Sequence, residues 1–134
     1  MDTSLINWAA VLVAALSAFM VGGIWYSSAL FGKAWMADSN LTTETVKAGN
    51  KGKIFGFTGL FSLLMAVNLA IFLAEAKTDV SWGATAGFLA GIWTFGAIAT
   101  HSLFELKGWR YIFINGGYSI VSLTIMGAIL GAWR

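Results

Sequence analysis

The sequence contains no cysteine and no proline, and only 10% of its residues are charged. Without cysteine, the chain forms no disulfide and has no thiolate for nucleophilic or metal chemistry. Without proline, no residue of that type interrupts the hydrogen bonds of a long helix, which argues against the broken helices that many transporters use at their binding sites. Soluble domains carry about a quarter charged residues, so this chain has too few charges to cover a surface in water.

Hydrophobic residues fill the positions that the charges leave and make up 58% of the chain. A helix needs about 20 apolar residues to cross a bilayer, and the chain has four stretches of at least that length. They lack the alternation with a period of two that is typical of membrane β-barrel strands. We therefore expect an all-α integral membrane protein, a four-transmembrane-helix bundle that forms one domain over residues 1–134. The predicted spans are about 5–26, 54–74, 80–104 and 111–133.

The basic residues lie unevenly on the two sides of these spans. Cytoplasmic loops are enriched in lysine and arginine, so we expect residues 27–53 to form a cytoplasmic loop and both termini to lie outside the cytoplasm. Asp2 and the lack of a basic residue before the first span are unlike a cleaved signal peptide, so we expect that span to be retained. The side predicted to be cytoplasmic holds Lys33, Lys47, Lys51, Lys53, Lys107 and Arg110, and the other side holds Lys77 and Arg134.

The first span ends in an aromatic motif, GGIWYSSALFGKAW, which also carries the first lysine. Tryptophan and tyrosine prefer the headgroup layer, and the apolar residues after them follow helical spacing, so we expect an interfacial anchor on the inner leaflet. The anchor residues are Trp25, Tyr26, Phe31, Lys33 and Trp35. The alternative is a docking site for a lipid or a partner. Farther along the loop, Thr42 or Thr43 followed by Glu44 predicts the start of a short helix.

Three stretches of the chain resemble the signatures of a known family: GGIWYSSALFGKAW, SLFELK and INGGYSIVSLTIMGAILGAW. The family consists of small bacterial four-span membrane proteins and is catalogued only as a domain of unknown function. Its members often have proline after the Trp-Tyr-Ser of the first stretch, whereas this chain has Ser28 there and lacks the ring that would bend it. The resemblance covers almost the whole chain. It implies a protein of the bacterial cytoplasmic (inner) membrane and implies no reaction.

The two halves of the chain repeat several residues at a constant spacing. Trp8 and Trp82 each begin a predicted span, and Lys33 and Lys107 each follow one, in both cases 74 positions apart. This pattern predicts a duplicated helical hairpin whose two copies share one orientation in the membrane. The alternative is that tryptophan and lysine are common at the ends of spans in any membrane protein.

Glycine recurs at every fourth position in the last two predicted spans. Gly83, Gly87 and Gly91 form a stripe in the third span, and Gly127 and Gly131 form one in the fourth. Lipid tails are as apolar as leucine, so membrane helices associate where small residues let their backbones approach. The stripes predict tight helix packing and a homo-oligomer, and they leave open whether a partner helix belongs to the same chain.

His101, the one histidine, and Glu105 are four residues apart near the end of the third span, so they share a helical face. Eighteen residues complete five helical turns, which places His101 below Gly83 and Glu105 below Gly87 on the packing stripe. We therefore expect both side chains to point toward protein rather than lipid. An ionisable residue within a span indicates a functional site.

Folding the last two spans into a hairpin extends this pair into a larger group. A turn near Lys107 brings Glu105 close to Arg110 and sets His101 level with the first turns of the fourth span. The candidate polar cluster is His101, Glu105, Arg110, Asn115 and Tyr118. The alternative is structural: an ordinary ion pair in the loop, and polar side chains that only hydrogen-bond a neighbouring helix.

A second and weaker polar group lies on the second span. Asn68 and Glu75 are seven positions apart, so a continuous helix would place them on one face. Glu75 is then a candidate cation site. The alternative is a solvated end residue close to Lys77.

Few residues suit an enzyme. The chain has no second histidine for a zinc site, Ser102 lies beside His101 on the helix and does not face it, and no glycine-rich phosphate loop occurs. We therefore expect no enzymatic activity, no metal and no cofactor. The basic residues indicate topology, so we expect no nucleic acid as a partner.

Two classes of function remain. In the first, a small oligomeric membrane protein binds or passes a small solute or an ion, such as the proton, through a helix bundle, and the polar cluster is its binding point or gate. In the second, the chain is a structural or accessory subunit that lies in the lipid bilayer and packs against copies of itself or against a larger membrane complex. The small multidrug exporters have a similar size but use a glutamate in the first span, and this chain has no carboxylate between Asp2 and Asp38.

Overall fold

A computed structural model describes residues 1–134, and all of its regular structure is helical. Four helices are long and apolar enough to cross a membrane: α1 (Trp8–Trp25), α4 (Lys51–Phe72), α5 (Val80–Phe104) and α6 (Trp109–Ala132). The shorter elements are η1 (Thr3–Leu5), a 3₁₀ turn, and the helices α2 (Gly32–Asp38) and α3 (Thr43–Ala48). The prediction of an all-α membrane protein with four spans is confirmed, and the long helices begin and end within a few residues of the predicted bounds.

Side-chain caps explain where several helices begin. Asn7, Asn50 and Asp79 precede α1, α4 and α5, and each accepts a hydrogen bond from a first-turn N–H at 2.8 to 3.0 Å. Such a bond satisfies a donor that the helix itself leaves free. Thr42 caps α3 by accepting a bond from the N–H of Thr45 at 3.1 Å, which confirms the short helix predicted in the loop.

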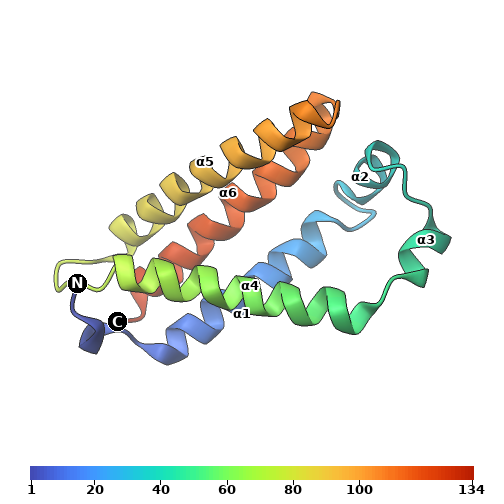
Figure 1. The fold of residues 1–134 in the computed structure, drawn as a ribbon. Coiled ribbons are helices and arrows are strands. Elements are labelled where there is room, and N and C mark those ends of the chain that lie inside the picture. Colours follow the sequence, from blue (N-terminus) through green and yellow to red (C-terminus); the bar gives the residue numbers. More distant parts are fainter.

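The long helices pack unevenly against one another. α5 and α6 form the most extensive helix pair, α1 packs on α6, and α4 packs mainly on α1. Figure 1 shows α5 and α6 side by side over their whole length, with α4 diverging from them. Both termini and the α4–α5 turn lie at one end, called here the terminal end, and α2, α3 and the α5–α6 turn lie at the other, called here the loop end.

Glycine sets the spacing of α5 and α6. A Cβ atom added at Gly83 would lie against the carbonyl oxygen of Gly127, and Gly87, Gly91 and Gly131 likewise face backbone atoms across the pair. The two backbones therefore touch directly, as small residues allow in membrane helices. The stripes of α5 and α6 are thus covered within the chain, so they do not offer a free surface for a second copy.

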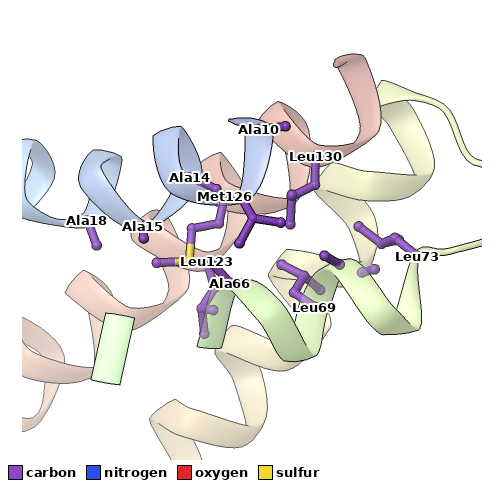
Figure 2. Close-up of a cluster of buried hydrophobic side chains, with 13 residues drawn as sticks. Ala10, Ala14, Ala15, Ala18, Ala66, Leu69, Leu73, Leu123, Met126 and Leu130 are labelled. Atoms are coloured by element: carbon purple, nitrogen blue, oxygen red, sulfur yellow. The ribbon is translucent and has the colours of Figure 1, made fainter. Parts of the chain in front are cut away.

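The core fills the space where α1, α4 and α6 meet, in the half of the protein near the terminal end. On α1 the buried face consists mainly of alanines, and Figure 2 shows Ala14 and Ala15 beside Met126 of α6. Leu69 of α4 and Leu73, directly after that helix, close the cluster from the third side. The alanines let α1 approach its neighbours closely, and Met126 fills the remaining irregular space.

The first half of α4 lies outside this core. From Lys51 to Phe61 almost every side chain is exposed, and Phe55, Phe57 and Phe61 are each more than half exposed. Phe19 of α1 is the neighbour that lies close to this part of the helix, at Gly59. An apolar helix surface exposed on all sides has hydrocarbon as its natural surroundings, which agrees with a membrane protein.

Candidate functional site: a polar groove at the loop end

The aromatic motif after α1 folds as a compact turn that builds one wall of the site. The N–H of Phe31 donates to the carbonyl oxygen of Trp25 at 3.1 Å, and the N–H of Gly32 donates to that of Ser27 at 2.9 Å. A Cβ atom at Gly32 would collide with the backbone of Tyr26, so the turn needs glycine at this position. The chain therefore bends sharply here without a proline.

The rings at the start of this turn reach α6 instead of only lying among lipid headgroups. Trp25 Nε1 donates to the carbonyl oxygen of Ile114 at 2.8 Å, and the Tyr26 hydroxyl donates to Asn115 Oδ1 at 2.7 Å. One turn deeper, the Tyr118 hydroxyl donates to a carbonyl oxygen of α1 at 2.8 Å. The anchor interpretation is incomplete for Trp25 and Tyr26, because both are half-buried and join α1 to α6.

The other three anchor residues differ among themselves. Phe31 and Lys33 are exposed, as residues at a bilayer surface would be. Phe31 stacks on Trp25 with the ring centroids 4.8 Å apart. Trp35 is half-buried and packs edge-on against Tyr26 at 5.3 Å, so it supports the wall of the site.

A bidentate ion pair holds α2 against the start of α6. Arg110 Nε and Nη2 donate to the two carboxylate oxygens of Asp38 at 2.8 and 2.7 Å, and the Arg110 guanidinium keeps the pKa of the Asp38 carboxyl below its ordinary value. Lys107 Nζ also approaches the carbonyl oxygen of Asp38, at 3.4 Å. The predicted pairing of Arg110 with Glu105 is wrong: in the first turn of α6, Arg110 faces α2 and not α5.

The remaining four members of the predicted cluster lie around one groove, called here the polar groove. It has a volume of about 520 Å³ and is lined by His101, Glu105, Asn115 and Tyr118. Tyr26, Tyr111, Ser102, Ser119, Thr94, Ala97 and Ile98 complete the lining. Most residues of the second list were not predicted as site residues, because they are ordinary polar or aromatic residues of spans whose convergence depends on three helices.

His101 and Glu105 are exposed at the side of the groove, which corrects the expectation that they face protein on the glycine stripe. The reason lies one to two turns away, where the ring of Phe95 sits on the backbone of Gly116. Towards the terminal end the two backbones touch, whereas here an aromatic ring separates them. The polar groove opens where that separation begins, and neither His101 nor Glu105 makes a hydrogen bond or an ion pair to another side chain.

The second polar group predicted from the sequence does not form. α4 ends at Phe72, so Glu75 lies in the turn beyond the helix, where its carbonyl oxygen accepts a bond from Arg134 Nη2 at 2.9 Å. Asn68 instead lines a separate hollow between α4 and α5, called here the apolar groove, with a volume of about 580 Å³. Asn68 Nδ2 donates to the carbonyl oxygen of Leu64 at 2.8 Å.

The chemistry of the polar groove is that of one carboxylate, one imidazole, an amide and three phenol rings. The hydroxyls of Tyr26 and Tyr118 are already bonded within the protein, so these residues offer mainly their ring faces. Tyr111 has Lys107 Nζ 5.2 Å from its ring centroid, which is the distance of a cation–π contact. No group of three or more histidine, aspartate or glutamate side chains lies close enough together to hold a metal ion.

Comparison with known proteins identifies the family. A family model described as "Protein of unknown function (DUF1761)" matches residues 9–131. The match covers nearly the whole chain, so the protein belongs to this family, which confirms the family resemblance read from its motifs. No curated protein and no solved structure gives a significant match.

Proposed function

We propose that this member of the DUF1761 family binds a small molecule with a positively charged head in the polar groove. The observation that carries the proposal is the exposed pair of His101 and Glu105, which lies against the groove and has no partner in the protein. His101 lies in the last turn of α5 and Glu105 follows the helix directly, and ionisable side chains within or at the ends of spans mark sites of binding or transport in membrane proteins. A ligand that pairs with Glu105 would give this carboxylate the partner that it lacks within the protein.

The charges around the groove favour a cation. Arg110 and Asp38 neutralise each other, which leaves Glu105 as the carboxylate of the lining. Lys107 stands at the rim, held by the Asp38 carbonyl oxygen and the Tyr111 ring. Glu105 is therefore the group to which a ligand cation would bind.

The aromatic lining favours an organic cation over a metal ion. Tyr26, Tyr111 and Tyr118 present rings to the groove, and ring faces attract ammonium groups, most strongly where water is excluded. Asn115 accepts a bond from Tyr26, so its amide N–H groups are free to donate to a hydroxyl or carbonyl oxygen of the ligand. The groove thus combines one ionic, one amide and several aromatic contacts.

Binding is better supported than passage through the bundle. Polar lining ends at Thr94, and the core beyond it consists of alanine, leucine and methionine side chains. An ion would have to leave the groove sideways to continue across the membrane. We therefore place binding first and treat passage of the ligand as a further step that needs its own assay.

Isothermal titration calorimetry of the purified protein with tetramethylammonium tests the proposal. Glu105→Gln keeps the shape of the side chain and removes its charge, so we expect about a tenfold loss of affinity, because a hydrogen bond or contact to a charge contributes roughly 1.5 kcal/mol or more. Glu44→Gln on exposed α3 is the matched control and should bind as the unmodified protein does. Equal affinity in all three proteins would contradict the proposal.

Reconstituted vesicles test passage. Protein-dependent uptake of tetramethylammonium or protons between about pH 5 and 8, the range in which histidine titrates, would support transport, and His101→Ala should then change its pH dependence. Vesicles with intact binding and no protein-dependent flux would limit the function to binding.

An accessory role is the second candidate, and the exposed half of α4 favours it. Ile54, Phe55, Phe57, Leu60 and Phe61 leave this segment without protein neighbours on most sides, which suits contact with a second copy or a larger complex. Light scattering of the detergent-extracted protein should then give a multiple of 14.3 kDa, and Phe57→Ala should lower it. A monomer with either sequence would count against this role.

The proposed orientation places the loop end in the cytoplasm of a bacterial cell, with the protein in the cytoplasmic membrane. The two connections between spans, with the helix ends beside them, hold six of the eight lysines and arginines at this end, and segments rich in basic residues face the cytoplasm. The polar groove would then open toward the cytoplasmic side. A reporter that is active only in the cytoplasm, fused after Arg134, should be inactive, and strong activity would reverse the orientation.

A further inference from the structure

We infer that the ligand is an amphiphile drawn from the surrounding bilayer, with its charged head in the polar groove and its hydrocarbon chain in the apolar groove between α4 and α5. This inference rests on the proposed binding of a cationic head near Glu105. It assigns a role to the apolar groove, which the binding of a small polar cation leaves unused.

The two grooves adjoin each other along α5. Thr94 lines both of them. From Thr94 the polar groove extends to Glu105, and the apolar groove extends the other way to Trp82. The 23 residue-to-residue steps from Trp82 to Glu105 correspond to about 35 Å of helix, close to the roughly 30 Å of the hydrocarbon core.

The lining changes from polar to apolar at that shared residue. Asn68 and Thr94 are the polar residues of the apolar groove, and each already donates a hydrogen bond to a carbonyl oxygen of its own helix. The other lining residues are Met65, Leu69, Phe72, Trp82, Ala86, Leu89, Ala90, Trp93 and Leu123. Two adjoining grooves, one lined by polar and aromatic residues and the other by apolar residues, match a molecule with the same division.

The size of the apolar groove favours a chain over a helix of a second copy. At the terminal end Phe72 and Trp82 close the space between α4 and α5, with ring centroids 6.1 Å apart. A helix is about 10 Å wide with its side chains, which is wider than the gap that this ring pair leaves at the closed end. A helix would lie on the groove, while a single hydrocarbon chain lies in it.

The first test compares two cations with the same head, tetramethylammonium and decyltrimethylammonium, by equilibrium dialysis against the protein in nanodiscs, with empty nanodiscs subtracted. We expect the decyl compound to bind at least tenfold more tightly. Ala90→Phe narrows the apolar groove and should remove this difference while tetramethylammonium binding persists. Gly96→Phe adds the same ring on α5 where a side chain meets open space, and it should keep the difference.

The same measurement separates this inference from the proposed function. If tetramethylammonium binds through Glu105 but chain length has no effect, the inference is overturned and the proposed function stands. If Glu105→Gln changes nothing while Ala90→Phe weakens only the decyl compound, the chain site is supported and the proposed head site fails. If neither cation binds the unmodified protein, both are overturned.

A second test does not depend on the folding of Ala90→Phe. The chain has no cysteine, so Leu89→Cys in the apolar groove and Leu12→Cys, exposed on α1 outside it, each accept a single bimane label. Decyltrimethylammonium brominated at the chain end should quench the label at position 89 several-fold more than at position 12. Equal quenching would overturn the inference, and disulfide-linked dimers of Leu89→Cys alone would assign the groove to a second copy.

Discussion

The protein contains two helical hairpins that use the same kinds of residue in opposite ways. In α5–α6 the glycines of one helix meet backbone atoms of the other over several turns. In the α1–α4 hairpin the main contact lies near the terminal end, where alanines of α1 meet Leu69 of α4 and Leu73 directly after it. Gly56 of α4, by contrast, faces open space.

The difference shows that a small residue lets two helices approach closely only where the facing helix also presents small residues. α6 presents Gly127 and Gly131 to the glycines of α5, whereas the loop-end half of α4 has no such partner and diverges (Figure 1). The apolar groove lies nearer the terminal end, between α5 and the last two turns of α4. The four substitutions that follow test how much the α5–α6 hairpin and the contacts between the two hairpins contribute to stability.

Gly87→Leu should have the largest effect. A side chain at this position meets the backbone of α6, which cannot rotate away, so we expect α5 and α6 to separate and the free energy of unfolding to fall by more than about 4 kcal/mol. Gly96→Leu, on the open face of the same helix, should change it by less than about 0.5 kcal/mol. Denaturant unfolding in detergent, followed by circular dichroism, measures both, and similar losses would refute the contrast.

Met126→Ala should come next, because Met126 joins the two hairpins. It is fully buried against the alanines of α1, so its truncation leaves a cavity and should cost about 3 kcal/mol. Met20→Ala is the control, since Met20 is largely exposed. The same unfolding curves decide the result, and an equal, small effect for both variants would mean that the hairpins do not rely on this contact.

Tyr26→Phe should have a smaller effect, about 1 kcal/mol, because it removes one hydrogen bond and leaves Asn115 Oδ1 unpaired. Tyr111→Phe removes a hydroxyl that makes no hydrogen bond within the protein and should be close to neutral. Thermal melts of the two variants compare them directly. A loss at Tyr111 as large as the loss at Tyr26 would show that the bond to Asn115 contributes nothing particular.

The smallest expected effect concerns pH and the tie between α2 and α6. The pKa of Asp38 lies below its ordinary value of 3.8 because Arg110 binds the carboxylate. A lowered pKa stabilises the folded state above that ordinary value, and the contribution disappears as the pH falls through the lowered pKa. Unfolding at pH 7 and pH 2 should therefore show less difference for Asp38→Asn than for the unmodified protein, and Glu44→Gln should behave as the unmodified protein does.

Much of the fold follows from local features of the chain. Long uncharged stretches predict the four spans, because the bilayer requires a minimum length of apolar helix and leaves few alternatives. Thr42 predicts α3 because a cap acts within one turn. The prediction that Asn68 and Glu75 share one helical face is wrong for a local reason as well. The helix ends at Phe72, so helical periodicity does not extend to Glu75.

The candidate site was predicted in part for an equally physical reason. His101, Glu105, Asn115 and Tyr118 belong to one hairpin with a short turn, so helix geometry alone brings them to one level. Arg110 was paired with the wrong carboxylate because Asp38 lies 72 positions away, on a helix whose placement depends on the turn after α1.

The sequence by itself determined that this is an all-α membrane protein with four spans, since hydrophobic length and capping act over one helix at a time. It also determined which faces of α5 and α6 are smooth enough to touch. Only the tertiary structure decided that these two faces meet each other within the chain, that Phe95 separates the helices beyond them, and that α4 diverges. Those outcomes depend on how surfaces from distant segments compete for the same neighbours, and the separation at Phe95 opens the polar groove on which the proposed function rests.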